Sequence, residues 1–430
     1  MAENSTAAAS GVRSGWPRRY GVVGLCFCAA FICYIDRVNI SVAIIAMQEQ
    51  FGWSETLKGF VLSSFFIGYM IGQVPSGWLG TRYGGKRVLG AAVVWWSLFT
   101  ILTPLAALLS LPLLIATRIA MGLGEAAMFP GTYTLFSRWV PTAERSRAVA
   151  LIVSGIPLGT LFALTTTGWL VTQHGWSSVF YLFGSFGILW ALVWYTRVHE
   201  DPQQHPRISP AERELLAQND LVVGSTVVVP WERIFRTPAV WALIVNHFCS
   251  NWTLYLLLAW LPSYFRTAQG LSITGAGLFS AAPWLTMLVM TNIAGWVADA
   301  LVKRGASLTF VRKLMQVVGL LGSAAFLYLA RDATSAATAL ALMCGALGAL
   351  ACTWAGYAPN HLDIAPKYAG VLLGITNTAG TIPGIVGVAI TGWLVEATGT
   401  YATAFALAAS VSVVGAAIWL MFGTARRVLE

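Results

Sequence analysis

Four ionisable residues lie inside long apolar stretches of the chain, where charge is costly. Asp36 and Arg37 occur in "CYIDRVNIS", and Arg118 and Glu125 occur in "RIAMGLGE". An arginine fork matches a carboxylate group with two parallel hydrogen bonds, and a buried carboxylate can take up and release a proton. Each ionisable group inside a membrane costs at least ~2.5 kcal/mol on insertion scales, which favours a functional role. The four residues therefore predict a site that binds an anion and exchanges protons.

The spacing of these residues indicates how they could meet. Arg118 and Glu125 are seven positions apart, which is two helical turns, so they share one face of a helix. Asp36 and Arg37 fall at a similar depth in another apolar stretch, and we expect pairing between the two helices. The alternative is a neutral structural cluster that only holds the helices together.

The elements that must position these residues are membrane helices. Of 430 residues, 57% are apolar and 10% are charged, whereas about a quarter of the residues of a soluble protein are charged. Windows long enough to cross ~30 Å of hydrocarbon recur along the chain. We therefore expect an all-α membrane protein with twelve transmembrane helices. The predicted spans are 20–46, 57–80, 88–109, 112–136, 148–173, 177–196, 239–264, 274–300, 313–331, 336–360, 368–395 and 400–423.

The basic residues predict the orientation of these spans. One side of the predicted membrane holds 21 of the 26 Lys and Arg residues, Arg13 among them, and the other side holds Lys58, Arg266 and Arg331. By the positive-inside rule both termini are cytoplasmic, and we expect the cell (inner) membrane. The net charge of +9 is then a signal of topology, so no nucleic-acid partner is expected.

The chain also repeats itself. "GWLGTRYGGKR" at 77–87 matches "GWVADALVKRG" at 295–305, and "TGWLVTQHG" at 167–175 matches "TGWLVEATG" at 391–399. Both matches join corresponding spans, six apart, which indicates two duplicated six-helix halves. Repeats of this kind are typical of transporters that rock their halves around a central site. The predicted division is an N-terminal half at 1–196, a cytoplasmic linker at 197–236 and a C-terminal half at 237–430.

Further polar residues are candidates for contact with a substrate. Tyr69 and Gln73 share a face of the second span, as do Asn251 and Tyr255, together with His247, on the seventh. Such residues can also simply link helices by hydrogen bonds. His247 is left out of the predicted substrate site, whose members are Arg37, Tyr34, Tyr69, Gln73, Asn251, Tyr255 and Asn377.

Several other classes of protein are disfavoured by the sequence. The six cysteines fall within the predicted spans without metal-ligand spacing, so we expect no disulfide framework, no metal and no cofactor. The chain lacks H-E-x-x-H, G-x-S-x-G and P-loop motifs, which argues against an integral-membrane enzyme. A membrane receptor would need neither duplicated halves nor buried charges. We expect a monomer.

Four segments closely resemble the anion:cation symporter family of the major facilitator superfamily. They are "YIDRVNIS", "RIAMGLGEAAMFPGTYTLFSRWVPTAERSRA", "YLLLAWLPSYF" and "NHLDIAPKYAGVLLGITNTAGTIPGIVG". That family includes bacterial sugar-acid transporters, sialin, vesicular glutamate transporters and plant plastid phosphate transporters. The resemblance runs from about residue 18 to residue 423 and implies the fold of that superfamily.

The resemblance also implies roles for the buried charges. Arg37 corresponds to the arginine that binds the anionic group of the substrate. Asp36 and Glu125 match the acids linked to proton coupling in the bacterial sugar-acid members, and Arg118 matches their gating arginine. Some of those members carry a Gln where this chain has Ile156 and Pro157, which weakens a specific sugar-acid assignment.

A gate is implied at the cytoplasmic ends of the helices. The loop at 77–87 resembles the conserved loop of the superfamily, but it carries Thr81 where an Asp is common, and Asp299 keeps that acid in the second half. A salt-bridge gate is also expected around Glu144, with Arg138, Arg145 and Arg147, although these residues could serve topology alone. The predicted gating residues are Arg82, Lys86, Arg87, Asp299, Glu144 and Arg145.

Together these features predict a secondary transporter that moves a small organic anion with protons by alternating access. A sugar acid or another carboxylate is the expected cargo. The alternative within the same class is inorganic phosphate, with sodium as an alternative to the proton as the coupled ion.

Overall fold

The computed structural model describes residues 16–141, 144–217 and 229–429, and all its regular elements in these ranges are helical. Twelve helices are long and apolar enough to cross a membrane, which confirms the predicted fold class. Their bounds are α1 Arg18–Phe51, α2 Glu55–Tyr83, α3 Gly85–Leu109, α4 Leu111–Glu125 with α5 Met128–Trp139, α6 Arg145–His174, α7 Trp176–Arg197, α10 Pro238–Thr267, α11 Ile273–Lys303, α12 Leu308–Ala330, α13 Ala336–Leu350 with α14 Thr353–Ile364, α15 Ala369–Thr398 and α16 Ala402–Phe422.

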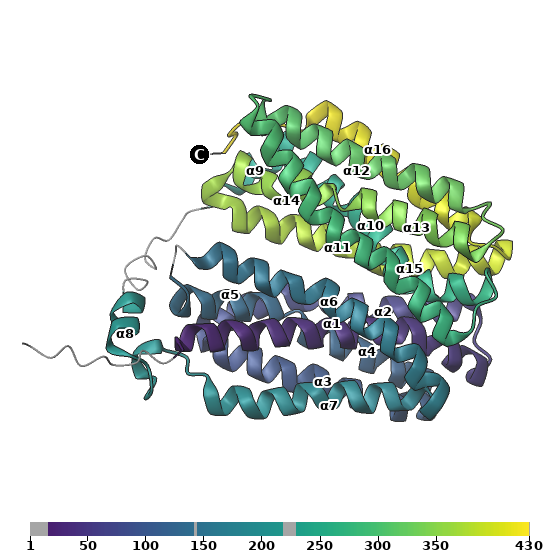
Figure 1. Ribbon diagram of the computed structural model, residues 1–430, viewed down its shortest axis with the longest axis horizontal. Helices are drawn as coiled ribbons and strands as arrows, with labels where there is room; N and C mark the ends of the chain where they lie inside the picture. Colours follow the sequence, from purple (N-terminus) through teal and green to yellow (C-terminus); the bar gives the residue numbers. More distant parts are fainter. Residues whose placement is uncertain (1–15, 142–143, 218–228, 430) are drawn as a thin grey trace, which may run out of the picture.

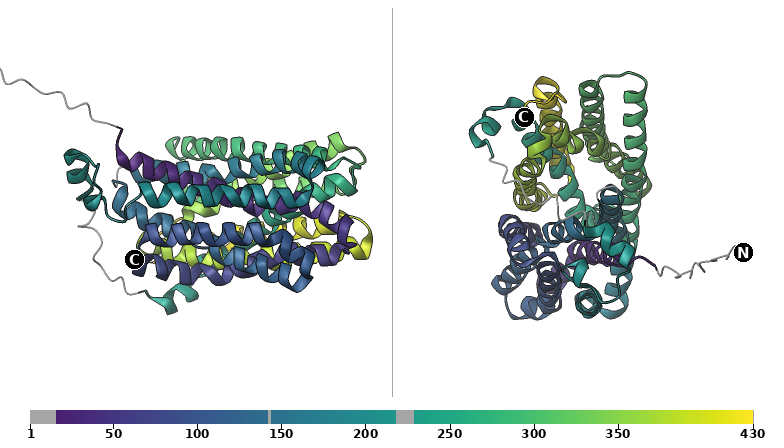
Figure 2. Two further views of the ribbon diagram at one scale, coloured as in Figure 1. Left: turned by 90° about the horizontal axis from the view of Figure 1, so that it is seen from below. Right: turned by 90° about the vertical axis from the view of Figure 1, so that its left-hand side faces the viewer.

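The helices form two bundles that lie side by side. Helices α1 to α7 make one bundle and α10 to α16 make the other (Figures 1 and 2). The segment between them contains η2 (Pro202–Gln204), α8 (Pro210–Ala217) and α9 (Trp231–Arg236). Arg13 and residues 218–228 of the expected linker lie outside the described residues. Boundaries at 197 and 236 remain our proposal for the division of the chain.

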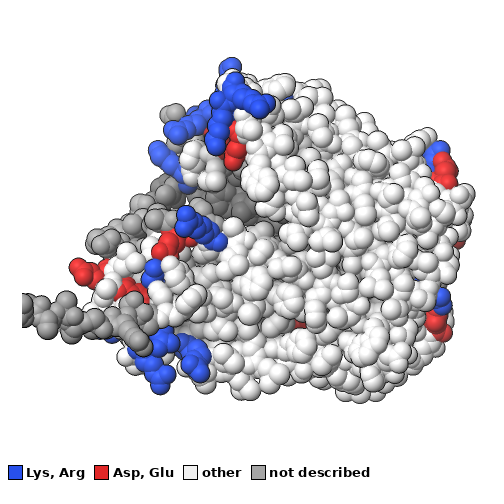
Figure 3. Space-filling model, in the orientation of Figure 1, with Lys and Arg blue, Asp and Glu red and all other residues white. Residues whose placement is uncertain are grey.

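Charged side chains gather at the two ends of the bundles. Lys and Arg are concentrated at the end that carries the linker and both ends of the described chain (Figures 1 and 3). We call this end the basic face and the other end the opposite face. Two ion pairs mark the opposite face: Arg266 with Glu49, and Arg331 with Asp332.

Two of the predicted spans are interrupted in corresponding places. Helix α4 ends before a turn at Ala126–Ala127, and α13 ends before a turn at Ala351–Cys352, 225 positions later. Pro130 has no N–H to bond the carbonyl of Ala126, and the Ser76 hydroxyl donates to that carbonyl instead, at 3.2 Å. The spans predicted at 112–136 and 336–360 are present, each as two consecutive helices instead of one. The shared position of the breaks agrees with duplicated halves.

The two bundles meet along α2 and α15 near the opposite face. Glu396 accepts a hydrogen bond from the backbone N–H of Thr56 at 2.7 Å, and Arg266 of one bundle pairs with Glu49 of the other at 3.2 Å. Gly392 touches the carbonyl of Glu55 so closely that a β-carbon has no room there. On the basic face the surface is hollowed between the bundles (Figure 3). The chain is therefore in a conformation closed at the opposite face.

Lys58 takes part in this closure from the first turn of α2. Its side chain is fully buried, and its Nζ lies 2.8 Å from Glu55 and 2.9 Å from the Gln48 side-chain oxygen. The ring of Trp260, from the other bundle, lies 4.9 Å away. A buried ammonium needs such partners because it has lost its water. Lys58 thus helps to join the two bundles.

Lys58→Met is expected to lower the thermal unfolding midpoint of the purified protein by several degrees. The change keeps the apolar stem but leaves Glu55 Oε2 and the Gln48 side-chain oxygen without their donor, a loss of about 1–3 kcal/mol. Arg331→Met is the matched control, because Arg331 lies on the same face and its contacts, with Asp332 and the ring of Tyr328, stay within one bundle. Equal midpoints for the two variants would contradict the closing role of Lys58.

Candidate functional site

Arg37 is held between α1 and α4 by Glu125. Its Nε and Nη2 both lie 2.9 Å from the same oxygen, Glu125 Oε2, and the side chains are 4% and 0% exposed. Glu125 is the last residue of α4, so the helix break presents its carboxylate to α1. Cys33 also donates to Oε2, whereas Oε1 has no hydrogen-bond partner among the described residues. The pairing that we expected between the two helices is this ion pair of Arg37 on α1 with Glu125 on α4.

Aromatic rings surround the same guanidinium group. The centroids of Tyr34, Phe65 and Tyr69 lie 4.7, 5.0 and 4.6 Å from the Arg37 Cζ. Ring faces attract a cation electrostatically, and the attraction strengthens where water is excluded. The Tyr34 hydroxyl is also 3.4 Å from Nη1. Phe65 is a site residue that the sequence analysis missed; its spacing of four from Tyr69 was the available signal.

Arg118 is a second buried cation beside this site, but it does not pair with Glu125. Its Cζ lies 5.4 Å from the centroid of Phe65, the ring that Arg37 also approaches. Its Nη1 lies 3.0 Å from the sulfur of Met121, and its Nε has no partner among the described residues. Arg118 and Glu125 lie on the same helix, yet the Glu125 carboxylate forms its ion pair with Arg37. Arg118 therefore keeps unused hydrogen-bonding capacity.

Asp36 lies apart from Arg37, which corrects the expectation of an acid and base acting as neighbours. Successive residues of a helix point about 100° apart, so an i, i+1 pair does not face itself. Asp36 lies beside the indole of Trp96 in the interior of its own bundle. It is fully buried, and within the described chain neither of its oxygens has a hydrogen-bond partner.

Polar side chains of α2 and α15 connect the two bundles one turn from Tyr69. Gln73 donates to Thr381 at 2.9 Å and accepts from Asn377 at 3.0 Å. These bonds must break if α2 and α15 separate. Thr381 was not predicted, although its spacing of four from Asn377 places it on the same face.

The two predicted residues of α10 behave differently from each other. The Asn251 amide donates to the carbonyl of Gly380 at 2.8 Å, so it links α10 to α15. Tyr255 packs against Phe66 of the other bundle, with ring centroids 4.5 Å apart. Only Tyr255 therefore lies at the junction of the bundles near the Arg37 cluster.

The predicted gating residues of the basic face are not brought together. Arg82, Arg87 and Asp299 are exposed, and Lys86 is partly buried. The acid at this loop is Glu200, which the sequence analysis missed. Its carboxylate accepts from the backbone N–H groups of Gly85 and Lys86 at 2.8 and 2.9 Å. Glu200 therefore caps the start of α3, where a negative charge is favourable.

Glu144 forms an ion pair with an arginine that the sequence analysis did not name. Its partner is Arg19 of α1, at 2.9 Å, and Arg19 also contacts Glu212 of α8 at 3.2 Å. Arg145 instead donates to the carbonyls of Val140 and Ser137 at the end of α5. These contacts tie the linker and α1 to the basic end of α6 in this conformation, and the expected gate around Glu144 remains a prediction.

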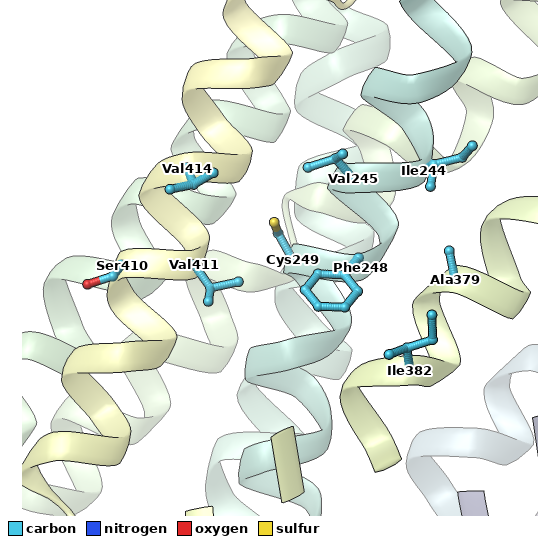
Figure 4. A pocket seen from close by; sticks show the side chains of 9 residues that line it. All are labelled: Ile244, Val245, Phe248, Cys249, Ala379, Ile382, Ser410, Val411 and Val414. Atoms are coloured by element: carbon cyan, nitrogen blue, oxygen red, sulfur yellow. The ribbon is translucent and has the colours of Figure 1, made fainter. Parts of the chain in front are cut away.

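A separate apolar groove lies among α10, α15 and α16 (Figure 4). It is lined by residues such as Phe248, Ile382 and Val411, with Ser410 as its one hydroxyl. It contains no charged residue and cannot supply the counter-charge for an anion. In the described ranges, no group of three His, Cys, Asp or Glu residues could hold a metal ion.

Two bundles of membrane helices that meet at one face, with a buried arginine beside their junction, have the architecture of a membrane transporter built from two halves. Residues 26–388 match the model of the Major Facilitator Superfamily, and the chain belongs to that family. The D-xylose-proton symporter has the same fold, with a TM-score of 0.75 at 18% identity over 94% of this chain and 98% of that one.

Relatives with higher identity are named as transporters of anions. The chain is 44% identical to probable anion transporter 4, chloroplastic, of Oryza sativa subsp. japonica, over 96% of this chain and 70% of the relative. It is 42% identical to two proteins of Arabidopsis thaliana, the chloroplastic ascorbate transporter and the chloroplastic sodium-dependent phosphate transport protein 1. The match covers 96% of this chain in both cases, and 76% and 81% of the relatives. The chain is an anion transporter of this superfamily.

The relatives also correct the expected location. The cell (inner) membrane was wrong, because these relatives are chloroplastic proteins. The count of basic residues distinguishes the two sides of a membrane, and it carries no information on which membrane that is.

Proposed function

We propose that the protein moves a small organic anion together with a proton, and that Arg37 binds the anionic group. The ion pair of Arg37 with Glu125 carries this proposal. A proton on Glu125 removes the negative charge and frees the guanidinium for a carboxylate of the substrate. The empty site is neutral when Glu125 is ionised, and the loaded site is neutral when Glu125 is protonated.

This arrangement couples the two ligands by electrostatics. An anion without a proton, or a proton without an anion, leaves an uncompensated charge inside the membrane, which costs several kcal/mol. Each ligand therefore favours the other, and the coupling is reciprocal. Asp36 is a second candidate proton carrier in this proposal, because burial of an ionised carboxylate without a partner is similarly costly. Arg118 is a second positive charge beside the site that could also contact an anion.

The surroundings of Arg37 favour an organic anion. Tyr34, Phe65 and Tyr69 offer ring faces that can pack against the carbon skeleton of a substrate. Gln73 and Asn377 offer amide groups for its hydroxyls when their mutual bond opens. The name of one relative, an ascorbate transporter, supports the same class.

Inorganic phosphate is the second candidate, and Arg118 favours it. A dianion is best held by two cations, and Arg37 and Arg118 approach the same ring of Phe65. A relative is named as a sodium-dependent phosphate transport protein. Sodium would then replace the proton as the coupled cation.

Uptake by proteoliposomes tests the proposal. Purified protein is reconstituted, and labelled ascorbate or phosphate is supplied with either an inward proton gradient or an inward sodium gradient. We expect ascorbate to accumulate under the proton gradient and not under sodium at equal pH. Accumulation of phosphate under sodium alone would replace the proposal by its alternative, and uptake of neither anion would reject both substrates.

A further inference from the structure

A second buried polar cluster lies in the C-terminal bundle, on α10, α14 and α15. His247, Thr376 and His361 are 6%, 0% and 3% exposed. The Thr376 hydroxyl oxygen lies 3.1 Å from His247 Nδ1 and 2.8 Å from His361 Nε2. These residues come from three helices and share no side chain with the Arg37 site.

The contacts determine which nitrogen of each ring carries a hydrogen. His361 Nδ1 lies 2.8 Å from the carbonyl of Ala358, which can only accept, so Nδ1 is protonated. In the neutral ring Nε2 is then an acceptor, and the Thr376 hydroxyl donates to it. The oxygen of that hydroxyl accepts from His247 Nδ1–H. Both neutral rings therefore carry their hydrogen on Nδ1, and His247 Nε2 keeps a free lone pair.

The cluster can accept one added proton without losing a hydrogen bond. The Thr376 oxygen also lies 3.3 Å from the carbonyl of Leu373. When a proton adds to His361 Nε2, the hydroxyl can turn to Leu373 while both rings donate to the two lone pairs of its oxygen. When the proton adds to His247 Nε2, the bridge stays unchanged. Two charged rings around one hydroxyl would repel each other, which limits the pair to a single proton.

Few other ionisable groups face the pair. The ring of Tyr357, on α14, lies 4.9 Å from that of His247. Asp363, two residues beyond His361, is engaged by Arg312 of α12 at 2.7 Å. Helix α16 has no ionisable residue, and the single acid of α15 is Glu396, near the opposite face. The remaining ionisable residues on helices packed against α10 are Arg18, Arg19, Asp36, Arg37, Glu49 and the Tyr and Cys residues of α1, Glu232, Arg233 and Arg236 of α9, Asp299 and Lys303 of α11, and Cys344 of α13.

We propose that His247, Thr376 and His361 form a second proton-binding site, in the C-terminal half, that holds one proton shared between the two rings. Its position on α15 links it to the motion of the bundles. Thr376 adjoins Asn377, which bonds to Gln73 of the other bundle. Separation of α2 from α15 therefore pulls directly on the helix that carries the bridging hydroxyl. Only this link to the motion rests on the proposed transport function.

Nitrogen-15 NMR of the full-length protein in nanodiscs tests the proposal without any substrate. The chain has five histidines, so His247→Gln and His361→Gln assign the two signals, and His174→Gln is an exposed control. We expect both buried rings to be Nδ1–H tautomers at high pH and to take up one proton in total on acidification. An Nε2–H tautomer at either ring, independent titration of both rings, or no uptake by either ring would overturn the proposal.

Thr376→Val and Thr376→Ser separate a bridging role from simple packing. Valine removes the hydroxyl, so we expect the titration of each ring to become insensitive to replacement of the other, while serine keeps the wild-type behaviour. Unchanged coupling in a folded Thr376→Val protein would contradict the bridge. If proton-driven uptake fails while the shared proton is observed, the proposed transport function is wrong and this site stands.

Discussion

Arg37→Lys is expected to weaken binding of the transported anion by about 10- to 100-fold, the loss of one charge-assisted hydrogen bond of about 1.5–3 kcal/mol. Lysine keeps the positive charge but loses the planar fork that meets a carboxylate with two bonds. It also loses the flat face that lies against Tyr34, Phe65 and Tyr69. Arg37→Ala is expected to bind more weakly still, because Glu125 then has no cation beside it.

Titration calorimetry with ascorbate and with phosphate measures this effect in purified protein. Arg236→Lys is the matched control, because Arg236 forms an exposed ion pair with Glu232 in α9. Its dissociation constant should equal that of the wild type. A folded Arg37→Lys protein with wild-type affinity for the transported anion would remove Arg37 from the binding site.

Glu125→Gln is expected to bind the anion and to lose its accumulation by a proton gradient. Glutamine imitates the protonated acid, so Arg37 is free at every pH. In the wild type, binding should weaken as pH rises, because ionised Glu125 competes with the anion for the guanidinium. In Glu125→Gln the affinity should be nearly independent of pH. Counterflow at equal pH should survive, since exchange of bound for free anion requires no proton release.

Asp36→Asn should differ from Glu125→Gln in one measurable way. The Asp36 side chain forms no ion pair with Arg37 in the described structure, so its replacement should leave the competition of Glu125 with the anion intact while proton-driven accumulation falls. Glu232→Gln, in the exposed pair of α9, is the control for both variants. Full accumulation by Glu125→Gln, or a pH-independent affinity of the wild type, would contradict the assignment of Glu125 as the competing acid.

The spans and their order could be predicted from the sequence because hydropathy is a local property. The interruptions at Ala126–Ala127 and Ala351–Cys352 could not, since alanine favours a helix and the apolar pattern continues through both turns. The first interruption had a signal in the sequence, because Pro130 lies four residues after Ala126 and has no N–H to bond the Ala126 carbonyl. The second has no proline in the same position, and its cause is not visible in the sequence.

The partners of the charged residues were harder to predict than the residues themselves. Arg37 and Glu125 are 88 positions apart, and Arg19 and Glu144 are 125 apart, so their pairing depends on how the helices pack. The separation of Asp36 from Arg37 was predictable, because adjacent residues of a helix face different directions. The burial of Lys58 was signalled by Glu55 three residues earlier, which can pair with it on a helix.

Glycines line the contact of α2 with α15. The equilibrium between the two conformations of the transporter should therefore depend on the volume of the side chains at these positions. Gly392 lies against the backbone of Glu55, and Gly384 lies against the ring of Phe66. A methyl group at either position would act as a wedge at the closed face, and its bulk would raise the energy of this conformation alone. Alanine, valine and leucine at Gly392 would then populate, to an increasing degree, the form that is open at the opposite face. These substitutions replace neither Arg37 nor any titrating group. They would make this second state of the transport cycle accessible to structure determination.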